Sequence, residues 1–150
     1  MAEEEAEKLS TTTETERGGE GEGDHKTHIV FAVDDSDESM FALKWAMDKL
    51  IALDHPHLYQ VYTLNVQPTL NIYPAPGFYI TPEVMDSLKK SQEKTSLDIL
   101  QRAKLVCDEK HVPSKTVSLV GDARDTICQA VEKLGADMLV MGSHGYGAIK

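Results

Sequence analysis

The feature that most constrains the fold of this chain is an alternation between short apolar runs and segments of helical periodicity. The runs lie at 29–33, 59–66, 116–120 and 137–141, and three segments with apolar residues at helical spacing separate them. The run Ile29–Val33 is apolar without interruption, which is typical of a strand covered on both faces. Strands that alternate with helices indicate a parallel sheet with helices on its faces. We therefore expect a three-layer α/β fold with the order β-α-β-α-β-α-β.

Start and stop signals bound the expected helices. The first follows Asp35, which we favour over Ser36 as the N-cap, and is expected to end near Leu53. The second begins at Thr81-Pro82-Glu83 and is expected to run to about His111. Its apolar stripe is weak in the middle, at Ser91-Gln92. Gly135 should terminate the third helix. The residues expected to face the core are Met40, Leu43, Trp45, Met47 and Leu50 in the first helix, Val84, Leu88, Thr95, Ile99, Ala103 and Val106 in the second, and Ile127, Ala130, Val131 and Leu134 in the third.

Residues 1–27 differ in composition from the rest of the chain. They hold nine acids and three bases, a net charge of −6 out of the chain's −10. A segment so poor in apolar residues cannot offset its ordering entropy, so we expect a disordered acidic tail and a folded domain at 28–150. The chain shows no basic face, no apolar run long enough for a bilayer and no signal-peptide pattern. We expect no nucleic-acid or membrane partner and a cytoplasmic location, with the nucleus as the alternative.

A loop of about fourteen residues, from Gln67 to Ile80, is expected between the second strand and the second helix. Such long loops are uncommon in compact domains and are often functional. It is rich in proline and carries the aromatic residues Tyr73, Phe78 and Tyr79. The alternative is a crossover whose aromatic side chains pack on the domain.

Candidate site residues stand where three expected strands end. Asp34 follows the first strand, Val66 ends the second, and Gly142 follows the fourth. Parallel sheets bind ligands at the carboxyl ends of their strands, where the strand order reverses, so Asp34 and Gly142 should flank such a point. Gly142 and Gly145 could form a phosphate cradle from backbone N–H groups or an ordinary turn. Asp34 could contact a nucleotide or cap the first helix.

Three motifs together resemble the universal stress protein family, in particular its plant-type single-domain members. They are the opening Ile29-Val-Phe-Ala-Val-Asp-Asp-Ser36 with the helix after it, Gly121-Asp-Ala-Arg-Asp-Thr-Ile127, and Gly135-Ala-Asp-Met-Leu-Val-Met-Gly-Ser-His-Gly145. The resemblance implies an adenine nucleotide alpha hydrolase-like sheet of order 3-2-1-4-5 and an ATP site, with Mg²⁺ as a candidate companion. The nucleotide-lining residues that it implies are Ala32, Val33, Asp34, Val66, Met141, Gly142, Ser143, His144 and Gly145.

The sequence departs from the family pattern at its carboxyl end. The family's ATP motif is Gly-x2-Gly-x9-Gly-Ser/Thr, whose third glycine would fall beyond Lys150. The fifth strand, which commonly carries the family's homodimer contact, is also beyond this sequence, so we expect the order 3-2-1-4 and an incomplete domain. Two functions follow. The first is a stress-response protein that binds ATP, with at most slow, switch-like hydrolysis and no catalytic set. The alternative is a protein-interaction or chaperone-like module that binds no nucleotide.

Overall fold

The computed structural model describes residues 25–51 and 55–143. Within them the elements are β1 (Thr27–Ala32), α2 (Asp37–Ala46), η1 (Met47–Ile51), η2 (Pro56–Leu58), β2 (Tyr59–Gln67), α3 (Pro82–Glu109), β3 (Ser114–Val120), α4 (Ala123–Lys133) and β4 (Met138–Met141). The element η1 is a π-helical turn that continues α2. The expected alternation of strands and helices is confirmed. Of the expected tail at 1–27, residues 1–24 lie outside the described residues, and Thr27 already belongs to β1. The end of the first helix near Leu53 and the residues from His144 onward also lie outside them.

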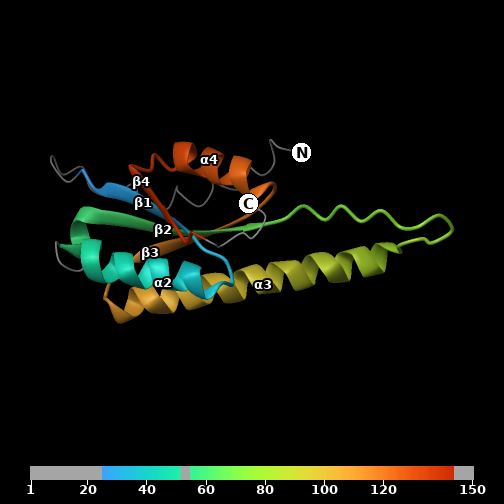
Figure 1. Ribbon diagram of the computed structural model, residues 1–150, viewed down its shortest axis with the longest axis horizontal. Coiled ribbons are helices and arrows are strands. Elements are labelled where there is room, and N and C mark those ends of the chain that lie inside the picture. Colours follow the sequence, from blue (N-terminus) through green and yellow to red (C-terminus); the bar gives the residue numbers. More distant parts are fainter. Residues whose placement is uncertain (1–24, 52–54, 144–150) are drawn as a thin grey trace, which may run out of the picture.

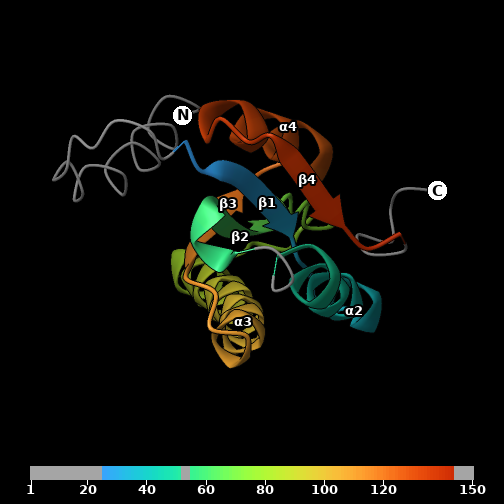
Figure 2. The same cartoon turned by 90° about the vertical axis from the view of Figure 1, so that its left-hand side faces the viewer.

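The sheet is parallel and its strand order is β3-β2-β1-β4, as predicted. Register is set around β1, where Ile29 pairs with Val61 of β2 and Met138 of β4. Helices α2 and α3 cover one face of the sheet and α4 covers the other, which gives three layers (Figures 1 and 2). Alternate residues of β1 therefore enter different cores, which explains why the run has no polar position. Phe31 packs under α2 and α3, whereas Val30 packs under α4.

Each of the α-helices α2, α3 and α4 begins with a side-chain cap. The cap of α2 is Ser36, whose Oγ accepts a hydrogen bond from the Ser39 amide at 3.2 Å, so the preference for Asp35 was wrong. The helix starts one residue later than that preference required, and Asp35 is exposed. Thr81 and Asp122 cap α3 and α4. Gly135 follows α4 with φ +59°, as a C-terminal glycine in the left-handed region should.

The expected core is only partly confirmed. Most of the predicted positions of the first and third helices are buried, but Trp45 is 49% exposed. In α3 the carboxyl half is buried at Ile99, Ala103 and Val106. Val84 and Leu88 are 50% and 38% exposed, because the first half of α3 projects beyond the end of the sheet (Figure 1). The predicted apolar stripe is therefore exposed in the first half of α3 and buried in the second half.

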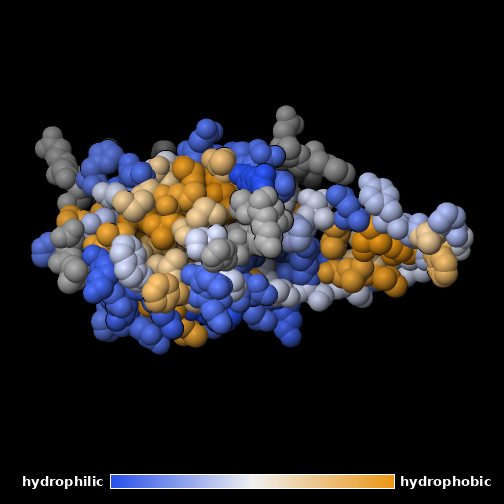
Figure 3. All heavy atoms as spheres, viewed as in Figure 1, coloured by the Kyte–Doolittle hydropathy of each residue, from blue (hydrophilic) through white to orange (hydrophobic). Residues whose placement is uncertain are grey.

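The long loop leaves the sheet together with the first half of α3. Its aromatic side chains do not pack on the domain, since Tyr73, Phe78 and Tyr79 are 89%, 76% and 82% exposed. Apolar atoms gather on this projecting part of the surface (Figure 3). The two cysteines lie in helices as expected and are free. Cys107 is buried and Cys128 is exposed.

Candidate functional site

The carboxyl edge of the sheet brings the predicted site residues from three strands together. Ala32, the last residue of β1, pairs with Leu64 of β2 on one side and Met141 of β4 on the other. The expectation that the fourth strand lies beside the first, away from the second, is therefore confirmed. Asp34, Val66 and Gly142 all stand at this edge. It is the switch point at which ligands bind in open parallel sheets.

Asp34 is held by the first turn of α2. Its Oδ1 accepts hydrogen bonds from the Ser36 amide, at 2.9 Å, and from the Ser36 hydroxyl. The Asp34 amide donates to Ser39 Oγ at 3.0 Å. The side chain is 9% exposed. Asp34 therefore does not cap the helix itself, but it orients Ser36, the residue that does. This turn also fixes the carboxylate at the rim of a hollow.

That hollow, the polar pocket, lies between α3 and the carboxyl ends of β1 and β2. Its volume is about 280 Å³. Both the predicted nucleotide acid and the residue predicted to pack on a base contribute to it. The rest of its lining combines amide and hydroxyl side chains with the apolar Pro68 and Ile99. The lining residues are Asp34, Asp35, Asn65, Val66, Gln67, Pro68, Gln92, Thr95, Ser96 and Ile99.

Hydrogen bonds fix the strand wall of the polar pocket. Asn65 Nδ2 donates to the Val33 carbonyl at 2.8 Å, which ties β2 to the end of β1. Gln67 Nε2 donates to Ser118 Oγ at 3.0 Å, and this hydroxyl lies 2.8 Å from Ser96 Oγ of α3. Buried polar groups in such a network hold one geometry, because each lost partner would be costly. The wall is therefore preorganised.

The helix wall of the pocket is tied to the loop. Gln92 Nε2 of α3 donates to the Pro68 carbonyl at 2.7 Å. Sequence reasoning missed Asn65, Gln67, Gln92 and Ser96 as site residues. A signal existed, because polar residues at the carboxyl end of a buried strand and a polar break in a helical stripe both require partners.

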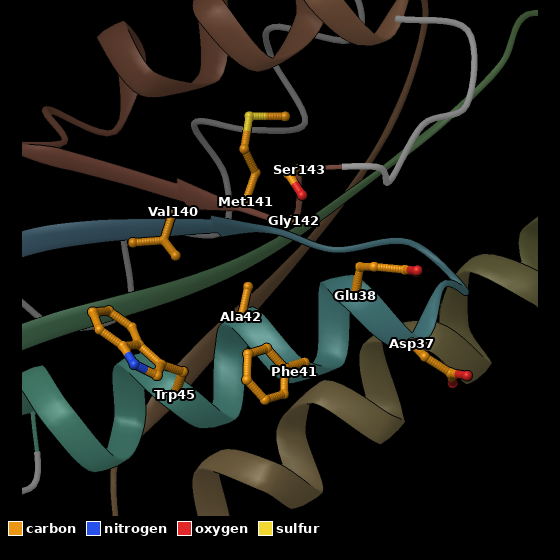
Figure 4. Close-up of a pocket in the computed structure, with 9 residues that line it drawn as sticks. All are labelled: Asp37, Glu38, Phe41, Ala42, Trp45, Val140, Met141, Gly142 and Ser143. Atoms are coloured by element: carbon orange, nitrogen blue, oxygen red, sulfur yellow. The ribbon is translucent and has the colours of Figure 1, made fainter.

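A second hollow, the apolar groove, lies between α2 and β4. Its volume is about 570 Å³ (Figure 4). The α2 side presents Phe41 and Trp45, and β4 presents Val140. The acids Asp37 and Glu38 stand at its end nearest Gly142. The lining residues are Asp37, Glu38, Phe41, Ala42, Trp45, Val140, Met141, Gly142 and Ser143.

The predicted site residues are thus divided between two hollows. Asp34 and Val66 meet in the polar pocket, whereas Met141, Gly142 and Ser143 line the apolar groove. Ala32 and Val33 are buried and line neither of these hollows. The predicted His144 and Gly145 lie outside the described residues.

Gly142 has a structural reason to be glycine. A Cβ at this position would lie 3.0 Å from the carbonyl carbon of Glu38 and 3.0 Å from the amide nitrogen of Ser39. Both are backbone atoms of the first turn of α2, so neither can rotate away. The glycine lets β4 end directly beside the helix. Its role in close packing was not among the sequence-based alternatives, a phosphate cradle and an ordinary turn.

Among residues 25–51 and 55–143 the structure shows no cluster of three or more His, Cys, Asp and Glu side chains placed to hold a metal ion. Nor does any helix in that part of the chain combine the length and apolar character needed to cross a membrane.

Comparison with known proteins identifies relatives in sequence. The profile of the universal stress protein family matches residues 26–150. Universal stress protein A-like protein of Arabidopsis thaliana is 28% identical over 112 residues, which are 71% of this chain and 61% of that protein. Universal stress protein PHOS32 of the same plant is 33% identical over 133 residues, or 81% of this chain and 52% of that protein. The chain spans less than two thirds of either relative.

Solved structures show the same fold. A universal stress protein family protein of Arabidopsis thaliana with AMP bound has a TM-score of 0.59 and 24% identity, over 83% of this chain and 81% of its own. A universal stress protein in complex with cAMP has a TM-score of 0.56 and 20% identity, over 82% of this chain and 80% of its own. At these identities the similarity establishes the arrangement of the sheet and helices.

Proposed function

The chain belongs to the universal stress protein family, and we propose that it binds an adenine nucleotide, ATP in particular, at the carboxyl edge of its sheet. The observation that carries the proposal is the polar pocket, in which Asp34 and Val66 from neighbouring strands meet. The AMP and cAMP complexes of proteins with this fold support an adenine nucleotide as the ligand class.

The polar pocket suits the nucleoside part of the ligand. The Asp34 carboxylate can accept hydrogen bonds from ribose hydroxyls or from the amino group of the base. Val66 offers an apolar contact to the base, and the amide side chains of Asn65 and Gln67 line the same wall. Ala32 and Val33 serve as the buried strand end that positions Asp34.

The phosphates would lie towards the loop that follows β4. Met141, Gly142 and Ser143 begin this loop, and His144 and Gly145 continue it in the sequence. The Ser143 hydroxyl and backbone N–H groups can donate to phosphate oxygens. Asp37 and Glu38 stand at the same end of the groove and would oppose unshielded phosphates. A Mg²⁺ ion carried by the phosphates would reduce this repulsion.

We propose a switch rather than an efficient enzyme. The described side chains in the two hollows include no histidine, cysteine or lysine that could assist phosphoryl transfer. Any hydrolysis by this arrangement should be slow and should serve to change the bound state. The relation to plant stress proteins supports a role in a plant stress response, and we propose the cytoplasm or the nucleus as the location. A fluorescent fusion of the full chain tests this location.

Calorimetric titration of the full chain with ATP, AMP and GTP tests the proposal. We expect saturable heat with the adenine nucleotides and a roughly tenfold loss of affinity in Asp34→Asn, a change of about 1.4 kcal/mol. Asn keeps the shape of the side chain and removes its charge. Asp98→Asn is the matched control, since Asp98 is exposed on α3 and lines neither hollow. No saturable heat with any adenine nucleotide would refute the proposal.

A second candidate function is a protein-interaction or chaperone-like module that needs no nucleotide. The observation that favours it is exposed apolar surface on the projecting loop and helix, with Phe78 at 76% exposure. If nucleotide titrations give no heat and the chain suppresses aggregation of an unfolded test protein, this second function is supported instead.

A further inference from the structure

The amide side chains that line the polar pocket all hold their NH2 groups against the protein. They are Asn65, Gln67 and Gln92. Asn65 Nδ2 and Gln92 Nε2 donate to backbone carbonyls at 2.8 and 2.7 Å, and Gln67 Nε2 donates to Ser118 Oγ at 3.0 Å. The nitrogen end of each amide is therefore engaged, and the oxygen is the end left for a ligand.

The hydrogen-bond partners fix the direction of these amides. A backbone carbonyl can only accept, so its partner on Asn65 and on Gln92 must be the nitrogen. Within residues 25–51 and 55–143, no hydrogen bond of the structure reaches the side-chain oxygen of Asn65, Gln67 or Gln92. Three amide oxygens are therefore available as acceptors.

Burial shows where two of these oxygens point. Asn65 and Gln67 are only 4% and 8% exposed. In the described part of the chain, the buried side-chain oxygens without a partner are Thr63 Oγ1 and Ser114 Oγ. The oxygens of Asn65 and Gln67 are not among them, so they reach solvent-accessible space. Because both residues line the polar pocket, that space is the pocket.

Neighbouring side chains add further acceptors to the polar pocket. Asp34 and Asp35 bring carboxylates. Thr95 donates its one hydroxyl hydrogen to the Ser91 carbonyl at 3.0 Å, so its oxygen can only accept. None of the described residues that line the pocket is a lysine, an arginine or a histidine. Such a pocket favours a ligand group that donates more than one hydrogen bond.

The strand order indicates which part of a nucleotide meets these oxygens. Across the sheet the order is β3-β2-β1-β4. In the proposed site the phosphates lie at the end of β4, and Asp34 stands at the end of β1. The next strand is β2, where Gln67 reaches towards Ser118 of β3. A nucleotide laid across the strand ends therefore brings to Gln67 the edge of the base farthest from the ribose, which in adenine carries the 6-amino group.

We propose that Gln67 and Gln92 determine which base the polar pocket accepts, because their side-chain oxygens accept the two hydrogens of the 6-amino group of adenine. This inference rests on the nucleotide site proposed above. Gln92 lies one helical turn before Ser96, whose hydroxyl is linked to Gln67 through Ser118, so the two glutamines meet at one end of the pocket. A 6-oxo purine would place its own carbonyl oxygen against these acceptors. The site should therefore select 6-amino purines.

Calorimetric titration of the wild-type full chain with three nucleotides tests the inference without any substitution. AMP, purine riboside monophosphate and IMP have nearly the same shape, and they carry an amino group, a hydrogen and an oxo group at the same ring position. We expect AMP to bind roughly 30-fold more tightly than IMP, because IMP leaves the pocket's acceptors unpaired and repels them. The riboside should lie between the two, since it removes the donors without adding an acceptor.

Substitutions at Gln67 separate recognition of the base from support of the fold. Gln67→Met keeps the length of the side chain and removes its oxygen, so the affinity for AMP should fall roughly tenfold while that for IMP stays the same. Gln67→Glu keeps an acceptor and should retain the preference for AMP. Gln60→Met is the matched control, since Gln60 lies on the same strand, lines neither hollow and should leave the ratio of the two affinities unchanged. A loss of structural support alone would weaken AMP and IMP equally.

Three outcomes would overturn the inference while AMP still binds. They are an affinity for IMP within about threefold of that for AMP, tighter binding of IMP than of the riboside, and a ratio of AMP to IMP affinity that Gln67→Met leaves unchanged. Circular dichroism checks the folding of the variants, and the order of the three ligands decides alone if Gln67→Met unfolds. The absence of saturable heat with all three nucleotides would instead refute the nucleotide site, and this inference with it.

Discussion

Two hollows lie near the end of β1, and they differ in size and in how firmly their walls are held. The polar pocket is the smaller, at about 280 Å³, and a hydrogen-bond network fixes its wall from Asn65 to Ser96. The apolar groove is larger, at about 570 Å³, and is lined by the exposed side of α2 with Phe41 and Trp45. The smaller hollow is therefore the one with the preorganised wall that a small-ligand site requires.

The difference shows that the first turn of a helix can divide the residues of one predicted site between two hollows. The first turn of α2 stands between Asp34 and Gly142, because Ser36 and Ser39 bond to Asp34 while Glu38 and Ser39 abut Gly142. A nucleotide that used both hollows would have to pass over this turn. We therefore propose that the polar pocket recognises the nucleoside and that only the end of the groove near Ser143 contributes to binding.

The largest expected effect is at Gly142, where it distinguishes a role in packing from a role in ligand binding. Gly142→Val should destabilise the fold by about 3 kcal/mol, the upper part of the usual range for overpacked positions. Its Cβ would meet immobile backbone of α2 at 3.0 Å. Urea unfolding measures the change. Ser143→Val, at the exposed neighbouring position, should change stability by less than about 0.5 kcal/mol. Equal losses in both variants would mean that close packing is not what Gly142 provides.

An intermediate effect is expected in the polar pocket. Asn65→Ala removes the donor to the Val33 carbonyl from a side chain that is only 4% exposed. We expect a loss of about 1–2 kcal/mol in stability together with weaker nucleotide binding. The control is Gln60→Ala, because Gln60 is partly buried and its amide makes only a long bond of 3.3 Å. Unfolding and calorimetry of both variants check the prediction, which fails if Asn65→Ala binds nucleotide like the wild type.

The smallest effect should come from the groove. Phe41 is 70% exposed, so Phe41→Ala should change the free energy of unfolding by less than about 0.5 kcal/mol. Nucleotide affinity should also stay the same, because the side chain lies outside the polar pocket. The same two assays apply. A marked loss of nucleotide affinity in Phe41→Ala would indicate that the nucleotide binds in the groove and not in the polar pocket.

The sequence predicted the fold well because its signals are local and repeat along the chain. Uninterrupted apolar runs such as Ile29–Val33 indicate buried parallel strands, and capping residues bound the helices. The strand order came from the family resemblance, and pairing of β1 with both β2 and β4 confirms it. The bounds of the folded domain stay a prediction.

Contacts between distant segments could not be predicted. No local signal shows that α3 extends beyond the end of the sheet. Val84 and Ile99 therefore look equivalent in the sequence, although Val84 is exposed and Ile99 is buried. The close approach of Gly142 to Glu38 likewise depends on how β4 meets α2 in space. The predicted site residues were correct as strand-end positions, but their division between two hollows needed the placement of α2.

The most direct test of the central claim is to map bound nucleotide by NMR on the full chain. Amide signals are followed while AMP or ATP is added to saturation. We predict that the shifts concentrate at Asp34, at Val66 and Gln67, and at Ser96 across the polar pocket, that ATP adds a shift at Ser143, and that Phe41 and Trp45 in the rest of the groove barely move. Shifts confined to the groove, or the absence of any saturable shift, would contradict it.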